Sequence, residues 1–521
     1  MGAQPSSGRR RTVVGWVALG LALVALQAIW SLTIPPMASP DEPSHVVHAA
    51  AIARGQWSGQ LGPAPTTPSS LGAATTVHLP SDYLPASRLQ DCFAHYPDQP
   101  ASCQPTVPAP DGTTVAVTTY AGQYPPLYYL LVGWPSRFLP AVPSMYAMRL
   151  LSGALASALV VWGLYRLRTV TRPAAWTWAA IAALTPMTLF VGAMVNPQAL
   201  EIPAAFAFWA ACLALVRSPG EPSRGTVVQA AVTGALLVNA RTSGPVWALT
   251  IVVVAIVMAP RGRLRLLWAL RSFRWALGAA VAAGLVAAAW VASHGAVVDG
   301  NVRFPRYASP LRVVALMMAD GYGFLVQMVG NFGWLDAPSP PLTVTVWTVV
   351  VGALLVTAVA ISGRRHRVGV LLSLLAVVAV PVVLQIPTAA HSGIIWQGRY
   401  SLPVAVGVPM VAAVALTVVG GPYDELARRV ARWLAVPAVA VAHVAAFLWA
   451  MRRYAVGLFG QLVTRSPDWS SPLGYLTAVA VYAVPVAVLA GVAWFTLRPT
   501  SATTAVAPIL MADERAAEPA A

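Results

Sequence analysis

Two adjacent carboxylates and a histidine follow the first apolar run of this chain. Asp41 and Glu42 lie between two prolines, and His45 follows them, directly after an apolar stretch over residues 12–34. In a chain that is 57% hydrophobic and only 10% charged, a pair of carboxylates at the edge of a membrane span is a candidate functional site. Carboxylates and histidines are also the side chains that most often transfer protons in catalysis. We therefore predict a catalytic site here, with Asp41 as the first candidate base and Glu42 as the second.

The surroundings of Asp41 decide whether it can act as a base. A neighbouring carboxylate and partial burial both raise the pKa of a carboxyl group, so we expect a raised pKa for Asp41 that suits proton abstraction near neutrality. The alternative is that Asp41 caps the following helix through the amides of its first turn. The two roles can also be divided between Asp41 and Glu42.

An arginine later in the chain is suited to bind an anion beside these carboxylates. Arg399 stands at the start of an apolar run, preceded by Gln397 and followed by Tyr400. A guanidinium group binds phosphate through two parallel hydrogen bonds, and an aromatic neighbour can face lipid. The alternative is an ordinary interfacial anchor. Three further residues are candidates for the same phosphate-binding role: Arg241, Arg149 and His45.

Two of these candidates can equally serve a structural role. Arg149 can pair with Asp41 or Glu42 and hold them in place, and His45 can be a polar residue on an interfacial helix. One carboxylate base with several cations suits transfer from a phosphate leaving group, because phosphate departs without being protonated. Glycoside hydrolysis generally needs two carboxylates instead.

A second polar segment, residues 299–341, carries further residues that suit sugar recognition. Trp334 is expected to stack on a sugar ring and Asp336 to hydrogen-bond to it, with a membrane-interface tryptophan as the alternative. Residues 311–329 have helical apolar spacing, which predicts an amphipathic helix beside the site.

Composition places all of these residues in a membrane protein. Of the 521 residues 57% are hydrophobic and 10% charged, and the mean hydropathy is +0.66. The net charge of +16 lies largely on arginines between apolar runs, where it sets topology rather than binding nucleic acid. Apolar runs of about twenty residues can cross roughly 30 Å of hydrocarbon. We therefore predict an all-α polytopic fold with about twelve spans: 12–34, 143–165, 174–195, 199–216, 225–240, 244–260, 273–294, 342–362, 368–387, 400–420, 433–451 and 474–497.

Arginines in alternate connections predict the orientation, because cytoplasmic connections carry most of the positive charge. Residues 1–11 are expected to be a basic cytoplasmic N-terminus, residues 12–497 the membrane domain, and residues 498–521 a disordered cytoplasmic tail. The segments 35–142 and 295–341 then lie on the extracytoplasmic side. We expect the active site on that side of the membrane.

The first long loop is expected to have structure of its own. Cys92 and Cys103 can form a disulfide if this loop is extracytoplasmic, with two free thiols as the alternative. Residues 46–57 are predicted to form a short helix on the membrane surface, and residues 58–76 a Gly-, Pro- and Thr-rich flap. Residues 123–129 are predicted to start a second interfacial helix.

Six short motifs resemble those of a bacterial membrane protein family, the domain-of-unknown-function family 2142. That family is similar in turn to the GT-C superfamily of integral-membrane glycosyltransferases. The motifs are Pro40-Asp41-Glu42-Pro43-Ser44-His45, Tyr124-Pro125-Pro126-Leu127-Tyr128-Tyr129, Arg149-Leu150, Asn196-Pro197, Gly333-Trp334-Leu335-Asp336 and Gln397-Gly398-Arg399-Tyr400.

The resemblance implies a multi-span enzyme that takes a sugar from a polyprenyl-phosphate donor, with a carboxylate of the first outer loop, here Asp41, as base. The chain departs from the family pattern at Gln198, where an aspartate is expected, and whether Glu201 replaces that acid is open. The expected substrate-binding residues are Tyr124, Tyr128, Asn196, Trp334, Asp336, Gln397 and Tyr400.

Other functional classes find less support in the sequence. Histidines at metal-ligand spacing with a carboxylate are absent, so we expect no metal cofactor, although a divalent ion at Asp41 and Glu42 stays open. Neither a P-loop nor a dinucleotide fingerprint occurs, which argues against a cytoplasmic nucleotide-sugar donor. The alternatives are a transporter or flippase for polyprenyl lipids or solutes and a non-catalytic envelope-assembly protein. The expected partners are membrane lipid, the lipid-linked donor and a glycan or lipid acceptor.

Overall fold

The computed structural model describes residues 6–61, 74–294, 304–419 and 422–498. The expected tail beyond residue 498 lies outside the described residues, as do residues 1–5 of the basic N-terminus. Parts of the expected flap and of the second polar segment, residues 62–73 and 295–303, also lie outside them.

The described part of the chain is a helical bundle with nine helices long and apolar enough to cross a membrane. Their hydropathy, rather than amphipathic periodicity, defines them, as expected for helices that face lipid on one side and protein on the other. The all-α polytopic prediction is confirmed. The nine are α1 (Ser6–Thr33), α5 (Ala141–Arg168), α8 (Gln198–Arg217), α12 (Arg271–His294), α15 (Pro341–Ile361), α16 (Arg364–Gln385), α18 with α19 (Leu402–Ala405 and Gly407–Val419), α20 with α21 (Pro422–Val430 and Val436–Val456), and α22 (Leu476–Thr496).

Three bent helix pairs raise the number of spans to as many as twelve if each pair crosses once. They are α6 with α7 (Pro173–Ala183 and Pro186–Gly192, 64°), α10 with α11 (Gly244–Met258 and Arg263–Ala269, 119°), and α13 with α14 (Pro310–Ala319 and Gly321–Gly330, 55°). The last pair replaces the single amphipathic helix predicted over residues 311–329. The predicted span over residues 225–240 is α9 (Arg224–Val238), which is too short to qualify alone.

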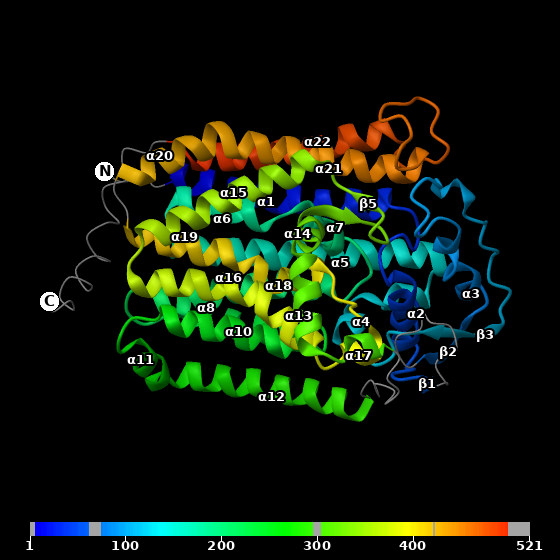
Figure 1. Ribbon diagram of the computed structural model, residues 1–521, viewed down its shortest axis with the longest axis horizontal. Helices are drawn as coiled ribbons and strands as arrows, with labels where there is room; N and C mark the ends of the chain where they lie inside the picture. Colours follow the sequence, from blue (N-terminus) through cyan, green and yellow to red (C-terminus); the bar gives the residue numbers. More distant parts are fainter. Residues whose placement is uncertain (1–5, 62–73, 295–303, 420–421, 499–521) are drawn as a thin grey trace, which may run out of the picture.

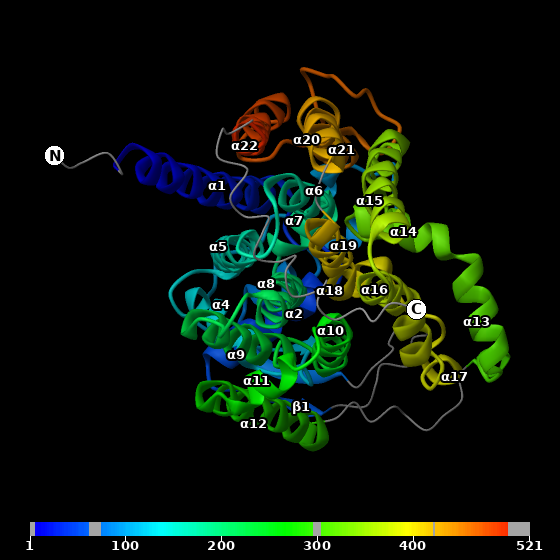
Figure 2. The same ribbon diagram turned by 90° about the vertical axis from the view of Figure 1, so that its left-hand side faces the viewer.

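Most of the long helices run side by side along the long axis of the molecule (Figure 1). Helix α8 lies at the centre, packed by α5, α9 and α10, and its apolar stretch is entirely buried. Helix α12 lies at the periphery and is almost entirely exposed (Figure 2). The bundle therefore has a protein-enclosed core around α8 and an outer layer that faces the surroundings.

One end of the bundle carries the first long loop, and we call it the loop end. Helix α2 (Glu42–Ala53) lies there, with ten of its twelve residues buried against α4 (Leu127–Val132) and the strands β2 and β3. The predicted surface helix over residues 46–57 thus begins earlier and is buried rather than interfacial. Its first turn contains Pro43, which needs no amide partner there, and Gly55 follows its end with a φ of 79°.

A small antiparallel sheet covers α2, and we did not predict it from the sequence. Strand β2 pairs on one side with β1 and on the other with β3, in a register that runs from Thr75 opposite Thr119 to Pro80 opposite Thr114. The strands are rich in threonine and valine, which favour extended backbone. The strands are β1 (Gln60–Leu61), β2 (Thr75–Pro80) and β3 (Thr114–Thr119), with a separate pair β4 (Asn331–Phe332) and β5 (Ala337–Pro338).

Short helices complete the connections between these elements. The bounds are α3 (Tyr83–Ala86), η1 (Leu89–Cys92), η2 (Ala101–Cys103), η3 (Trp134–Arg137), η4 (Pro305–Tyr307), α17 (Ala389–Ser392), η5 (Gly398–Ser401) and η6 (Ala431–Ala435).

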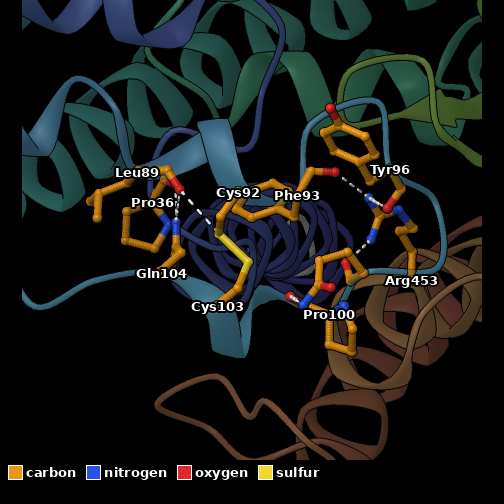
Figure 3. Close-up of a disulfide and its surroundings, with 10 residues drawn as sticks. Pro36, Leu89, Cys92, Phe93, Tyr96, Pro100, Cys103, Gln104 and Arg453 are labelled. Carbon is orange, nitrogen blue, oxygen red and sulfur yellow. Dashed lines mark hydrogen bonds between the residues drawn. A yellow bond between two sulfur atoms is a disulfide. The ribbon is translucent and has the colours of Figure 1, made fainter.

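A disulfide joins the two cysteines of the first loop. Cys92 and Cys103 are bonded, with Cα atoms 6.0 Å apart, as the sequence led us to expect for an extracytoplasmic loop. Figure 3 shows Arg453 of α21 reaching the ring that this disulfide closes, where it donates to the carbonyl oxygens of Phe93 and Tyr96 at 2.8 and 3.0 Å. The disulfide ring therefore docks onto α21 through a buried arginine.

Replacing both cysteines by serine is expected to destabilise the loop end. The cysteines are 11 residues apart, and closing a loop of this length is worth about 3 kcal/mol through the entropy of the unfolded chain. The measurement is the thermal unfolding midpoint in detergent micelles, with and without reductant. Cys212→Ala, which removes the buried free thiol of α8, is the control. A parent protein whose midpoint is insensitive to reductant would contradict this account.

Candidate active site

The carboxylates of Asp41 and Glu42, where α1 connects to α2, lie in different surroundings. Asp41 adopts a left-handed backbone with φ 62°, a conformation that aspartate tolerates better than most residues. Its side chain is 52% exposed, whereas that of Glu42, the next residue, is fully buried. Asp41 precedes α2 but makes no side-chain hydrogen bond to its amides. The geometry thus argues against the helix-capping alternative, and the catalytic role of Asp41 stays a prediction.

Glu42 forms a buried two-point ion pair with Arg149 of α5. The Nε atom of Arg149 donates to Oε1 of Glu42 at 2.7 Å, and Nη2 donates to Oε2 at 2.5 Å. The backbone amide of Val195 also donates to Oε1 at 3.0 Å. Both carboxylate oxygens of Glu42 are therefore occupied inside the protein.

Arg149 has no donor left for another anion. Its remaining N–H groups donate to the carbonyl oxygens of Ser31, Ile34 and Pro35 at 3.1, 2.7 and 2.9 Å. These bonds account for all five N–H donors of a guanidinium group. The geometry favours a positioning role for Arg149 and Glu42 over the phosphate-binding and catalytic roles that the sequence suggested for them.

Asp41 is paired with a different arginine, Arg399, which lies 358 residues later in the sequence. Nη2 of Arg399 donates to Oδ2 of Asp41 at 2.8 Å. Arg399 is only 1% exposed, so a buried cation meets an accessible carboxylate. The first candidates for base and for phosphate binding are thus in direct contact.

The Arg399 side chain forms hydrogen bonds with two neighbours in sequence, Gln397 and Tyr400, and with Gln198 of α8. Its Nε donates to Oε1 of Gln397 at 2.7 Å, and its Nη1 donates to Oε1 of Gln198 at 3.0 Å. Its Nη2 also donates to the hydroxyl of Tyr400 at 3.3 Å. Gln397 and Tyr400, which we expected to bind substrate, therefore contact Arg399 in this structure.

Arg241 also lies against the ring of Tyr400 and is only loosely paired. Its guanidinium carbon is 4.8 Å from the centre of the Tyr400 ring, and that of Arg399 is 4.9 Å from it. Nη2 of Arg241 reaches the Tyr124 hydroxyl at 3.4 Å and Nη1 reaches Oε2 of Glu201 at 3.5 Å, both at the long limit for polar contact. Its Nε has no hydrogen-bond partner among the described residues. This arginine has donor capacity to spare.

The charges around Asp41 lower its pKa. Desolvation raises the pKa of the carboxyl group, but Arg399, through its charge and its hydrogen bond, and then Arg241 favour the charged form and give a net downward shift. The raised pKa that we expected for Asp41 is therefore wrong. That expectation assumed that Glu42 acts as a like charge, whereas Arg149 neutralises Glu42 and a cation stands next to Asp41 instead. Asp41 is ionised at neutral pH.

Two histidines of α2 lie behind Asp41 in an aromatic cluster. Nδ1 of His45 and the hydroxyl of Tyr129 share a hydrogen bond of 2.9 Å, and the His45 ring meets Tyr124 edge-on at 5.4 Å. His48 meets Tyr129 edge-on at 4.4 Å. Burial lowers the pKa of His45 to about 3 and that of His48 to about 4. Both rings are neutral at pH 7, which gives His45 no charge with which to attract phosphate.

Asn196 and Tyr128 connect the Asp41 turn to the start of α8. Nδ2 of Asn196 donates to the carbonyl of Pro40 at 3.3 Å, and its backbone amide donates to the Tyr128 hydroxyl at 2.9 Å. That hydroxyl also shares a hydrogen bond of 2.8 Å with Ser152. Both residues therefore hold the turn in place, which favours positioning over the substrate contact that we expected.

Trp334 and Asp336 belong to a separate polar cluster. Oδ2 of Asp336 accepts from Arg453 at 2.8 Å and its Oδ1 accepts from the backbone amide of Trp334 at 3.1 Å. Nε1 of Trp334 donates to the carbonyl of Met37 at 3.3 Å. These contacts tie the β4–β5 hairpin to the first loop, and they favour a structural role for both residues over sugar binding.

Gln198 is a site residue whose role we did not predict from the sequence. It stood out there only as a departure from the expected acidic residue. In the structure its Nε2 also donates to the backbone carbonyl of Arg399 at 3.1 Å, so it contacts both the side chain and the main chain of that arginine. Its position directly after Asn196-Pro197, a motif already singled out, was the available signal.

The arrangement can accept a proton and hold an anion at neighbouring points. Asp41 supplies one ionised and accessible carboxylate, and Arg399 with Arg241 supplies two cations beside it. No group of three metal-ligating side chains gathers within the described ranges, and Glu42 is committed to Arg149. The expected lack of a metal cofactor stays a prediction.

Comparison with known proteins gives one family and two similar structures. A family model described as "Predicted membrane protein (DUF2142)" matches residues 24–408. No curated protein sequence matches the chain. ArnT from Cupriavidus metallidurans bound to undecaprenyl phosphate is similar at a TM-score of 0.43 and 16% identity, over 93% of this chain and 77% of that one. The apo state of the same protein gives a TM-score of 0.43 and 15% identity over the same shares.

Glu42→Gln is expected to destabilise the protein by about 3–5 kcal/mol, because it leaves Arg149 buried without a counter-charge. The measurement is unfolding in detergent micelles, followed by thermal midpoint and by denaturant. The matched control is Glu425→Gln, which removes an exposed carboxylate paired with Arg428 and Arg429 and is expected to change the stability much less, because solvent screens exposed ion pairs. Equal losses of unfolding free energy in the two variants would show that the buried ion pair stabilises the protein no more than the exposed one.

The two buried histidines are expected to make the fold acid-sensitive. Their pKa values in the folded state lie below the ordinary value of about 6.5, so the unfolded chain binds more protons, and stability falls as pH drops from about 6.5 towards 4. Each histidine is expected to cost about 2 kcal/mol on going from pH 7 to pH 5.

The corresponding measurement is the unfolding midpoint between pH 7 and pH 5 for the parent and for His48→Gln. The variant lacks one of these titrations, so its fall in stability between pH 7 and pH 5 should be about 2 kcal/mol smaller than that of the parent. His78→Gln, at an exposed position of β2, should leave the profile unchanged. A His48→Gln profile as steep as that of the parent argues against the neutral buried state.

Proposed function

We propose that this chain, which belongs to the DUF2142 family of membrane proteins, transfers a sugar from a polyprenyl-phosphate donor to a hydroxyl group of a cell-envelope acceptor. Asp41 is the base in this proposal, and Arg399 with Arg241 holds the phosphate that departs. The motif resemblance to the GT-C glycosyltransferases supports the reaction class. The geometry around Asp41 supports the assignment of residues.

One observation carries the proposal. The accessible carboxylate of Asp41 lies 2.8 Å from the buried guanidinium of Arg399, while the second guanidinium, of Arg241, has an Nε without a partner among the described residues. A buried cation is costly unless its charge is compensated, so unused donors beside it favour an anionic ligand. A base and an anion site side by side are what transfer from a phosphate donor needs.

The proposed reaction has a single displacement step. The acceptor hydroxyl gives its proton to Asp41 while its oxygen forms a bond to the anomeric carbon of the sugar. The bond between that carbon and the phosphate oxygen breaks, and polyprenyl phosphate leaves with the electron pair. Arg399 and Arg241 stabilise the charge on the leaving phosphate, as preorganised cations do in other phosphate-transfer sites.

The lowered pKa of Asp41 is consistent with a base that is activated when the donor binds. In the absence of donor the carboxylate is stabilised by Arg399, which makes it a weak base. A phosphate that binds to the guanidinium competes with Asp41 for the same donors, and the added negative charge raises the pKa of the carboxyl group. Asp41 thus becomes a stronger base only when the donor is in place.

The proposed orientation places the loop end on the extracytoplasmic side of a bacterial plasma membrane, with both termini in the cytoplasm. The distribution of arginines supports it, because those in the connections at the opposite end outnumber those at the loop end. The disulfide between Cys92 and Cys103 supports it too, because such bonds persist in oxidising compartments.

Asp41→Asn is expected to lower sugar transfer by at least about a hundredfold, the scale of a lost general base, without loss of donor binding. The assay uses proteoliposomes, undecaprenyl phosphate that carries a labelled pentose or hexose, and cell-envelope glycan as acceptor. Binding of undecaprenyl phosphate is measured in parallel. The variant should bind it at least as tightly as the parent, because Arg399 loses a competing anion.

Asp111→Asn is the matched control, since this carboxylate lies in the same loop and hydrogen-bonds only to Ser81 and Thr113 in the described structure. It should transfer sugar at the parental rate. Undiminished transfer by Asp41→Asn would remove Asp41 as the base. A parent protein that turns over no donor but moves the lipid between leaflets would replace the transferase by a flippase.

A further inference from the structure

Gln198, the first residue of α8, contacts Arg399 at two points. Its Oε1 accepts from Nη1 of the guanidinium at 3.0 Å, and its Nε2 donates to the backbone carbonyl of the same arginine at 3.1 Å. Its own backbone amide is fixed by Oδ1 of Asn196 at 3.0 Å, and its side chain is fully buried. A rigid amide therefore sets both the position and the direction of the Arg399 side chain.

This contact adds no charge to the site. The partners of the Arg399 guanidinium in the described structure are Gln198, Gln397, the Tyr400 hydroxyl and Asp41, and of these only Asp41 carries a negative charge. The Asp41 carboxylate is half exposed, so solvent weakens its electrostatic attraction to Arg399. The positive charge of Arg399 is thus only partly compensated.

The other buried arginine at the loop end shows the contrast. Arg149 faces both oxygens of Glu42 and three backbone carbonyls, which uses every donor that it has. A second carboxylate on Arg399 would bring it towards the same saturated state. The amide at position 198 keeps the geometry of such a contact without its charge.

We infer that Gln198 is a positioning residue for the donor phosphate, which fixes Arg399 in place while leaving its positive charge available to a lipid-linked phosphate group. The inference rests on the proposed function, since it assumes that Arg399 binds the phosphate of the donor. It predicts that the charge at position 198, rather than the packing, controls phosphate affinity.

Gln198→Glu separates charge from packing. Glutamate has the same shape and forms a new ion pair with Arg399, which offsets the loss of the hydrogen bond from Nε2 of Gln198 to the Arg399 carbonyl, so the unfolding midpoint should stay near the parental value. The affinity for undecaprenyl phosphate should nevertheless fall by at least about tenfold, because an added negative charge within a few ångströms repels the phosphate and competes for the guanidinium. Gln198→Met removes the clamp without adding charge, and should lower both the midpoint and the affinity, the affinity by less than Gln198→Glu does.

The experiment measures the Kd of the full-length protein for undecaprenyl phosphate in nanodiscs, with uncharged undecaprenol as the reference for tail binding. The matched control is Gln229→Glu, because Gln229 is a fully buried glutamine that accepts from Nε of Arg166 at 3.0 Å, at the other end of α5. It should leave the Kd unchanged.

The outcomes separate the two claims. A parent protein that binds undecaprenyl phosphate no better than undecaprenol overturns the proposed function itself. A parent that binds the phosphate, with a Gln198→Glu variant of equal stability that binds it as tightly, overturns only the inference about Gln198. An affinity that follows the unfolding midpoint across both Gln198 variants also overturns it, since that is the behaviour of a purely structural residue.

Discussion

The buried ion pair between Glu42 and Arg149 is the contact on which the loop end depends. Removing two charges from water costs several kcal/mol each, and only a two-point contact with further hydrogen bonds repays that cost. The pair meets this condition, because Val195 and three carbonyls at the end of α1 complete its hydrogen bonds. It fixes α1, α2 and α5 to one another and so determines where Asp41 stands.

Neighbouring residues in the sequence thereby take opposite roles. Glu42 is turned inward and neutralised, while Asp41, held in a left-handed turn, is turned outward to an arginine that has not used all of its donors. The same chemical pair, carboxylate and guanidinium, stabilises the fold in one case and forms a displaceable contact in the other. The difference lies in exposure and in the number of competing partners rather than in residue type.

Hydropathy was sufficient to predict the membrane helices, because the cost of exposing backbone to lipid leaves few other folds for long apolar runs. Asp41 and Arg399 were also identified individually, since charge at a membrane boundary is rare. Their partners were not predictable. Whether Arg149 meets Asp41 or Glu42 depends on a turn with a left-handed residue, and the direction of the Asp41 pKa shift depends on that choice.

The burial of α2 and the small sheet over it were missed for a related reason. We assigned the segment after the first span to the membrane surface because it is moderately polar. In the structure β2 and β3 supply a second covering layer from residues more than twenty positions further along the chain. Burial of this kind is a long-range property, which local periodicity does not report.

The distance along the chain between Asp41 and Arg399, 358 residues, has a consequence for biogenesis. At typical synthesis rates the ribosome needs roughly 20 to 70 seconds to pass from one residue to the other. The pair between Glu42 and Arg149, whose separation is only 107 residues, can form earlier in that interval, once Arg149 has been made. A nascent chain that stops before η5 carries the carboxylate without its arginine, so the site is complete only after η5 has been made.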